Sequence, residues 1–511
     1  MARFEIGVYS HSIVVSGFDL AGKGILLRFI EKRLLHFVFA GMNKVTGRPE
    51  SKPGKIFGGA FANRRQMTFH VNTLPWLLDY LDFSGCRKED IVVTHYPKPV
   101  PMKCEFKSIS GKIPTEDQSG AIDYLSAPNE TIKLLTTQTG SGKTLMALRS
   151  MVNLGLRTAI VLRAGYMEKW AIDLNEEFEL APSDVMLIKG EKSLIAAIRD
   201  AIEGKLVAKV LVISNRTLYA FLDDYEKSNG DSDKYLIPPI QLFETLKVGY
   251  RIIDETHQDF HFNFRLDCYT NIQTTTDLSA TMVSSDSFIN RMYKLRFPLE
   301  IRFKGMQYDK YIRGYCLFYR LYSAKSIRYI RRGMNAYSHV DFEKSIMKNK
   351  KILRAYVNMI LDLVTSIYVE NHEKGQRAIV FAATIDFCTI LTNEINARHP
   401  ELAVGRYVED DPYETLFNSD IIVSTQMSAG TAVDIPGLRY TIMTNAIDSR
   451  QSNEQLLGRL RRLKNWPNVT PEFYYLTCAD IDAHLRYHRS KTQFFKDKVL
   501  SLTEMNLRGG I

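Results

Sequence analysis

Residues 132–144 read IKLLTTQTGSGKT, and the helix-like run LMALRSMV follows at 145–152. The apolar start predicts a buried strand, and the small residues after it predict a tight loop that opens directly into a helix. In such a loop, backbone N–H groups wrap phosphate oxygens, and the N-terminus of the helix adds favourable partial charge. The stretch therefore predicts a phosphate-binding loop in an α/β domain, with an ordinary glycine-rich turn as the alternative.

The expected ligands of this loop are ATP and Mg²⁺. Lys143 is expected to reach the terminal phosphates, and the hydroxyl of Thr144 is expected to hold the metal ion. The generic pattern begins with glycine, but that position is Thr137 in this chain. The loop residues expected to contact ATP are Thr137, Gln138, Thr139, Gly140, Ser141, Gly142, Lys143 and Thr144.

A pair of acidic residues follows about 110 residues downstream of the phosphate loop, where residues 250–257 read YRIIDETH. An apolar strand there ends in Asp254 and Glu255, and two adjacent carboxylates repel unless a cation or a proton intervenes. Asp254 is expected to bind Mg²⁺ through water, and Glu255 is expected to polarise the attacking water. A solvated strand end is the alternative, and the pairing with the phosphate loop favours the catalytic interpretation.

The chain divides into four expected segments. Apolar runs that alternate with helical stretches predict parallel α/β domains at 106–290 and 355–505. The short alternating runs within 1–105 predict a small α+β domain. Its loop carries four basic residues, which suggest binding to duplex DNA, with an ordinary basic surface loop as the alternative; they are Lys52, Lys55, Arg64 and Arg65. The proline-rich PKPVPM at 97–102 predicts a linker to the first α/β domain.

The fourth segment, 291–354, is expected to be a basic, tyrosine-rich linker or insert. It holds 17 Lys and Arg against 4 Asp and Glu, and eight tyrosines. Basic residues interleaved with tyrosines are typical of surfaces that neutralise phosphates and stack bases. Arg328, Arg331 and Arg332 are therefore expected to contact nucleic acid. The alternative is a structural linker whose tyrosines fill a core and whose charges are solvated.

Composition narrows the class of protein. The net charge of +10 and pI of about 9.0 favour a polyanionic partner. Six cysteines without a CxxC pair indicate neither a zinc site nor a disulfide framework, and a cytoplasmic location fits them best. The N-terminus lacks the pattern of a signal peptide, and no run of about eighteen uncharged apolar residues indicates a membrane span.

With these elements in place, the sequence resembles the superfamily 2 helicases. TEDQSGAIDYL at 115–125 is similar to the Q-motif region, which implies that Gln118 reads the adenine edge of ATP. VLRAGYMEKWAIDL at 161–174 is similar to motif Ia, which implies that Arg163 contacts nucleic acid. LSATM at 278–282 matches motif III, which implies that Ser279 and Thr281 couple hydrolysis to movement.

The resemblance continues in the second α/β domain. STQMSAGTAVDIPGL at 424–438 resembles motif V, which implies that Thr425 contacts nucleic acid and that Gly430 and Asp434 lie at the nucleotide. QLLGRLRR at 455–462 resembles motif VI, which implies catalytic roles for Gln455, Arg459 and Arg462. Their i, i+4 and i+7 spacing would put these three side chains on one face of a helix.

The resemblance implies two RecA-like parallel-sheet domains in tandem, with ATP bound between them and nucleic acid lying across both. DETH and the glutamine that opens motif VI resemble the DNA-directed branches, and the plan resembles phage-encoded branch-migration and recombination helicases. Single-stranded or branched DNA is therefore the expected partner, with unwinding or remodelling in replication, recombination or repair as the role. Three alternatives remain: an RNA helicase, a double-stranded DNA translocase that separates no strands, and a non-catalytic scaffold that binds nucleic acid.

Overall fold

The computed structural model divides the chain into two compact units. The first contains Met1–Thr137 and Gly142–Met306, and the second contains Gln138–Ser141 and Gln307–Ile511. The residues that the structure describes are 3–35, 37–42, 49–53, 58–61, 66–138, 140–228, 230, 234–280, 282, 287–303, 305, 308–322, 327–330, 337–408, 411–429 and 435–511.

The main sheet of the first unit has six parallel strands in the order β10-β11-β9-β12-β13-β8. Along the chain, these strands alternate with helices, as the apolar runs of the sequence predict. The elements are α3 (Glu116–Ser126), β8 (Ile132–Thr136), α4 (Lys143–Leu154), β9 (Thr158–Leu162), α5 (Met167–Glu177), β10 (Val185–Ile188), α6 (Glu191–Ile202), β11 (Val210–Ser214), α7 (Asn215–Lys227), α8 (Leu242–Thr245), β12 (Tyr250–Ile253), α9 (Phe260–Asp267), β13 (Thr274–Ser279) and α10 (Ser287–Arg296).

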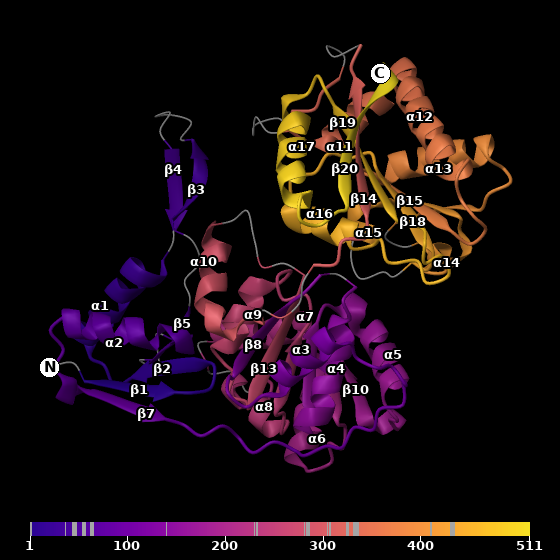
Figure 1. Ribbon diagram of the computed structural model, residues 1–511. Helices are drawn as coiled ribbons and strands as arrows, with labels where there is room; N and C mark the ends of the chain where they lie inside the picture. Colours follow the sequence, from indigo (N-terminus) through magenta and orange to yellow (C-terminus); the bar gives the residue numbers. More distant parts are fainter. Residues whose placement is uncertain are drawn as a thin grey trace. The chain divides into compact units, whose positions relative to one another are not determined.

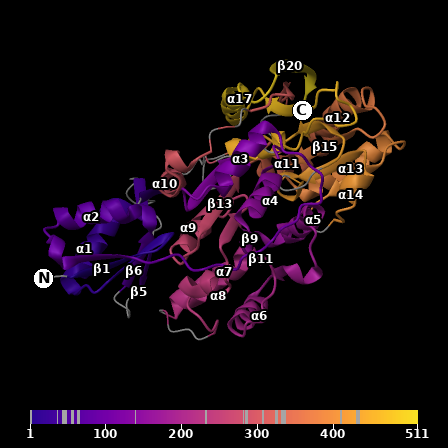
Figure 2. The same cartoon turned by 60° about the horizontal axis from the view of Figure 1, so that its bottom comes forward.

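Helices cover both faces of this sheet because its strands are apolar on both sides. In β9, Ala159 and Val161 pack into a cluster with α6, α7 and α8, whereas Ile160 and Leu162 pack into a cluster with α3, α4 and α5. Figure 2 shows the two groups of helices on opposite sides of β9 and β11. Continuous apolar runs are the pattern of a parallel sheet buried on both faces.

The N-terminal part of the first unit forms a mixed sheet in the order β5-β6-β2-β1-β7. Its elements are β1 (Phe4–Val8), β2 (Ser12–Ser16), α1 (Leu20–Phe29), β5 (Gly58–Phe61), β6 (Gln66–His70), α2 (Leu74–Phe83) and β7 (Ile91–His95), and β3 (Phe37–Met42) pairs with β4 (Pro49–Pro53) in a separate ribbon. One apolar cluster joins this part to α9 and α10. The side chain of Lys52 and residues 55, 64 and 65, expected in a basic loop, lie outside the described part of the chain.

The second unit is built on seven parallel strands in the order β16-β17-β15-β18-β19-β14-β20. Side chains of β15 alternate between a cluster with α11, α12 and α13 and a cluster with α16 and α17, and Figure 1 shows α12 and α17 on opposite sides of the sheet. The elements are β14 (Arg313–Arg320), α11 (His339–Met347), α12 (Lys350–Val364), β15 (Arg377–Ala382), α13 (Ile385–Arg398), β16 (Val404–Tyr407), α14 (Thr415–Asn418), β17 (Ile421–Thr425), α15 (Gln426–Ala429), β18 (Leu438–Met443), α16 (Arg450–Leu457), β19 (Glu472–Cys478), α17 (Asp482–Phe495) and β20 (Ser501–Gly510).

The segment 291–354 differs from the expected linker, because parts of it belong to folded layers. The strand β14 lies inside the second sheet between β19 and β20, and α10 packs in the first unit. Tyr293 and Tyr319 are buried, and Tyr315 stacks on Tyr474 with ring centroids 4.6 Å apart. These tyrosines fill cores, as the structural alternative for this segment predicts.

One helix among the described residues, Lys350–Val369, is long and apolar enough to cross a membrane by length and composition alone. Half of its apolar window is buried in the second unit. Its buried residues, including Tyr356, Ile360 and Val364, pack in the cluster that covers β15. The helix therefore has a core-packing face, and the charged Lys351 and Arg354 are exposed away from it.

Candidate functional site

The predicted phosphate loop lies between β8 and α4, as the sequence indicates. Gly140 and Gly142 have φ values of +89° and +88°, a region that favours glycine. Lys143 is the first residue of α4, and its Nζ donates to the carbonyl oxygen of Thr137 at 3.1 Å. Thr144 is the second residue of α4, whereas Thr139 lies outside the described residues. The N-terminus of a twelve-residue helix therefore opens directly after the loop.

Gln118 lies against this loop. It occupies the first turn of α3, where it forms a reciprocal capping box with Thr115. A Cβ atom added at Gly142 would lie 2.7 Å from Gln118 Nε2, so the Gln118 side chain would have to move away from the loop. The structure thus brings Gln118, Gly142 and Lys143 together in the first unit.

The tip of the loop, Gln138–Ser141, groups with the second unit. There, Gln138 donates to the carbonyl oxygen of Asp309 at 3.2 Å and accepts from the backbone N–H of Asp309 at 2.8 Å. A Cβ atom at Gly140 would overlap the guanidinium of Arg461. Arg461 was not among the residues predicted from the sequence.

The two predicted carboxylates follow β12 directly. Asp254 Oδ2 accepts from Trp170 Nε1 at 2.8 Å, and its Oδ1 accepts from the backbone N–H of Glu255 at 2.9 Å. Burial and the charge of Glu255 raise the pKa of Asp254, while Lys143 is near enough to oppose that shift. Glu255 and Lys143 therefore both lie close enough to Asp254 for their charges to act on it.

Asp254 and Thr144 fit a magnesium ion that is held mainly by water and phosphate oxygens. Among the described residues, no group of three or more His, Cys, Asp and Glu side chains is arranged to hold a metal ion. Mg²⁺ at nucleotide sites keeps several waters and takes only one or two protein oxygens in addition to those of the phosphates. Asp254, whose half-buried carboxylate is subject to the charge of Glu255, and the Thr144 hydroxyl supply oxygens of that kind.

The loop after β12 is tied to the neighbouring strand β13. His257 Nδ1 lies 2.7 Å from Ser279 Oγ, the residue predicted to couple hydrolysis to movement. Burial and the charge of Lys143 lower the pKa of His257 to about 4, so the imidazole is neutral near pH 7. Thr281, the second predicted coupling residue, lies outside the described residues.

Arg163 follows β9 and is held by an acidic partner. Its Nε and Nη2 contact the two carboxylate oxygens of Asp259 at 2.6 and 3.0 Å. An open pocket beside it is lined by Arg163, Ala164, Asn215, Arg216, Tyr219, Asp259 and Phe262. Asn215, Arg216 and Tyr219 come from the start of α7 and were not predicted from the sequence, although they also follow a strand end.

The expected single helix face of Gln455, Arg459 and Arg462 is wrong. The helix α16 ends at Leu457, and Gly458 forms its C-cap, so both arginines follow the helix rather than extend it. Arg459 is buried, whereas the side chain of Arg462 is 66% exposed and pairs with Asp309 at 2.7 Å. Glycine has low helix propensity and commonly ends helices, which explains the difference.

The other predicted residues of the second unit are only partly described. Thr425 ends β17, and its Oγ1 lies 2.9 Å from Ser428 Oγ. Gly430, Asp434, Arg331 and Arg332 lie outside the described residues. Arg328 is exposed, and its backbone N–H donates to Ser345 Oγ at 2.8 Å.

Comparisons with known proteins agree on the fold. No protein-family profile and no curated protein matches the sequence. S. cerevisiae Dbp5 bound to RNA and ADP BeF3 is similar at a TM-score of 0.51 and 12% identity, over 78% of this chain and 90% of that one. Mss116p bound to ssRNA and AMP-PNP is similar at a TM-score of 0.52 and 15% identity, over 78% and 75%. The expected fold, two RecA-like parallel-sheet domains with a small N-terminal α+β domain, is confirmed.

Proposed function

We propose that the chain is an ATP-driven motor that acts on nucleic acid, and specifically a DNA helicase or translocase. The observation that carries this proposal is that Lys143, at the start of α4, lies close enough to act on the half-buried Asp254, which is followed directly by Glu255. A cation at a helix N-terminus beside two acids suits the binding and hydrolysis of a nucleoside triphosphate. The fold shared with Dbp5 and Mss116p supports a motor built on two such domains.

In the proposed mechanism, Lys143 neutralises charge on the terminal phosphates and Glu255 takes a proton from the attacking water. Mg²⁺, held by Thr144 and Asp254, supplies further neutralisation of the phosphate oxygens when it is bound. Gln118 contacts the adenine, and Gln455, Arg459 and Arg462 act on the transferring phosphoryl group when the two domains close. The pair His257 and Ser279 transmits the state of the site along β13.

DNA is the proposed polymer, since DETH and Gln455 resemble the DNA-directed branches of superfamily 2. Arg163 and Thr425, with Arg328, Arg331 and Arg332, are the proposed contacts to its backbone. We further propose that branched or forked DNA is the substrate. RNA is the second candidate, because both solved structures named above carry RNA.

The test is steady-state ATP hydrolysis without nucleic acid and with single-stranded DNA, duplex DNA, a branched junction and single-stranded RNA. Stimulation that is greatest on the junction supports the DNA-remodelling role. Stimulation by RNA alone would show that the polymer is RNA, the second candidate, and would leave the ATP-driven motor assignment unchanged. Turnover on duplex without strand separation in a parallel unwinding assay indicates a translocase.

Lys143→Ala is expected to abolish ATP turnover, because the ammonium group that neutralises the terminal phosphates of ATP is lost. Nucleic-acid affinity is expected to stay within about twofold, because Lys143 is proposed to contact only ATP. The control is Lys112→Ala, which removes an exposed lysine of the same unit. Turnover and nucleic-acid affinity are measured on the same preparations. Normal hydrolysis by Lys143→Ala would refute the assignment of the phosphate loop.

A further inference from the structure

The strand β13 is unusual in its composition. It reads TTTDLS, all six of its residues are buried, and only Leu278 is apolar. The side chains of Thr275, Thr276, Asp277 and Ser279 are 0% exposed. Buried polar groups are costly unless they are hydrogen-bonded, so the partners of these side chains explain why the strand has this composition.

One face of β13 carries three polar side chains in a row, because residues alternate between the two faces of a strand. Thr275 Oγ1 lies 2.7 Å from Nε2 of His11, which belongs to the N-terminal domain. Asp277 Oδ1 accepts from Thr256 Oγ1 at 2.6 Å, and Ser279 Oγ lies 2.7 Å from His257 Nδ1. This face therefore runs from the N-terminal domain to the loop that contains Asp254 and Glu255.

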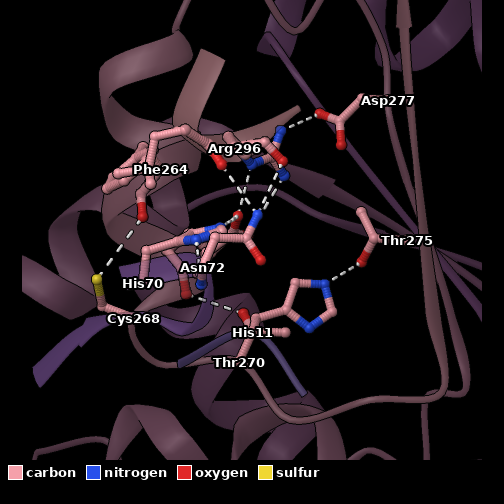
Figure 3. A network of polar contacts seen from close by, with 12 residues as sticks. His11, His70, Asn72, Phe264, Cys268, Thr270, Thr275, Asp277 and Arg296 are labelled. Atoms are coloured by element: carbon pink, nitrogen blue, oxygen red, sulfur yellow. Dashed lines mark hydrogen bonds and ion pairs between the residues drawn. The ribbon is translucent and has the colours of Figure 1, made fainter. Parts of the chain in front are cut away.

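A buried ionic cluster holds the centre of this face, and Figure 3 shows it with the N-terminal histidines. Arg296 donates to Asp277 Oδ1 at 2.6 Å and to Asp267 Oδ2 at 2.5 Å. Arg251 also pairs with Asp267. Two guanidinium groups thus face two carboxylates where all four side chains are 0% exposed.

The N-terminal domain completes the cluster on its other side. His70 Nε2 lies 3.5 Å from Asp267 Oδ2, and Asn72 donates to the carbonyl oxygen of Leu295 at 2.9 Å. Burial lowers the pKa of His11 and of His70, which favours the neutral form of both rings. The cluster therefore links β6, α9, α10, β12 and β13, and His11 lies directly before β2.

Glu255 shows why the position of this loop matters. Its φ of +47° is rare for a residue with a side chain, and such a conformation persists only where its surroundings hold it. The next two residues fix this conformation, because Thr256 is hydrogen-bonded to Asp277 and His257 is hydrogen-bonded to Ser279. The backbone N–H of Thr256 also donates to the carbonyl oxygen of Leu278 at 3.0 Å.

We propose that Asp277, fixed by Arg296, is a positioning residue that holds Thr256 and thereby Glu255, and that His11 connects the N-terminal domain to the same strand. This inference rests on the proposed hydrolysis of ATP. The N-terminal domain then acts on turnover through β13, in addition to anything it binds. A group that only positions the catalytic carboxylate affects kcat and leaves nucleotide affinity largely unchanged.

The first test compares Thr256→Val, which removes the hydroxyl, with Thr256→Ser, which keeps it. The control is Thr276→Val. Thr276 is as buried as Thr256 but lies on the opposite face of β13, where its Oγ1 accepts a hydrogen bond from the Tyr250 hydroxyl at 2.9 Å. We expect kcat of Thr256→Val to fall at least about tenfold with KM for ATP within about twofold, and Thr256→Ser and Thr276→Val to stay within about threefold of the unmodified chain.

The second test compares His11→Leu with His11→Gln, whose amide can replace the Nε2 contact to Thr275. We expect a lower kcat only in His11→Leu, with thermal melting used to confirm that each variant is folded. Unchanged kcat in folded Thr256→Val overturns the positioning role, and unchanged kcat in folded His11→Leu overturns the link to the N-terminal domain. An unmodified chain without ATP hydrolysis would instead refute the proposed function, so the two failures are distinguishable.

Discussion

Glu255 combines a strained backbone with the chemistry proposed for it, since its φ is +47° and it follows the half-buried Asp254. Glu255→Gln keeps the shape of the side chain and removes the base, so we expect normal ATP binding and turnover reduced about 100-fold or more. A filter assay for retained nucleotide, run beside steady-state hydrolysis, measures both. Glu244→Gln, at an exposed site of the same unit, is the control. Full activity of Glu255→Gln would remove this carboxylate from the chemistry.

Single residues of the site were predictable where a short motif carries them. Lys143 and Asp254 follow directly from GSGKT and DETH, because GSGKT places Lys143 at the start of a helix and DETH places Asp254 directly after a strand. Trp170, which donates to Asp254, lies 84 positions away in the chain, and no local pattern indicates that contact. Asp277 had a usable signal, since a carboxylate within a buried strand requires a buried partner.

At the scale of elements, apolar runs predicted the strands well, while helix ends were less predictable. The runs at 132–137, 158–164 and 250–255 contain β8, β9 and β12. The spacing in QLLGRLRR suggested one continuous helix, but α16 stops at Leu457. The i, i+4, i+7 argument assumed that the helix continues through Gly458, and glycine is the residue least suited to that apart from proline.

The helix α11 contains a buried carboxylate with a testable effect on stability. Glu343 accepts from the backbone N–H of Ala383 and from Thr384 Oγ1, both at 2.8 Å. Burial raises the pKa of Glu343 from 4.5 to about 7, and the two hydrogen bonds only partly oppose this. Because the folded-state pKa is raised, the contribution of this group to stability is complete below about pH 4.5 and is lost as the pH rises through about 7.

The free energy of unfolding of Glu343→Gln is compared with that of the unmodified chain at each pH. We expect this difference to favour the variant more at pH 8 than at pH 4.5. One pKa unit corresponds to about 1.4 kcal/mol, so the relative gain has an upper limit of about 3 kcal/mol. Urea unfolding at both pH values measures it, with the exposed Glu370→Gln of the same unit as control. An equal loss of stability at both pH values would show that the carboxylate hydrogen bonds outweigh the cost of ionisation.

For the molecule as a whole, the sequence predicted two parallel sheets because both are built from continuous apolar runs. It did not predict how 291–354 is used, since a high density of charge and tyrosine is compatible with both a surface and a core. The structure buries Tyr293 and Tyr319 yet leaves Arg328 exposed. The separation is incomplete, because Arg296 of the same segment is buried beside Asp267 and Tyr322 is 73% exposed.

The charge of this segment, 17 basic against 4 acidic residues, exceeds the net charge of +10 for the entire chain. A polyanion that binds through its phosphates releases counterions, so its affinity falls with salt in proportion to the number of contacts. Replacing Arg328, Arg331 and Arg332 with Glu is expected to weaken binding to single-stranded DNA and to lower the slope of log K against log salt by about 2, at about 0.7 per lost contact.

A matched variant distinguishes the loss of direct phosphate contacts from the effect of a lower net charge. Replacing Lys192, Arg199 and Lys205 with Glu changes the net charge equally, and these exposed residues belong to α6 and the turn after it. Affinity is measured by fluorescence anisotropy at several salt concentrations. If the 328–332 variant alone loses slope, its arginines contact phosphates directly. If both variants lose affinity equally, only the overall field of the protein acts, and the basic segment is a solvated structural element.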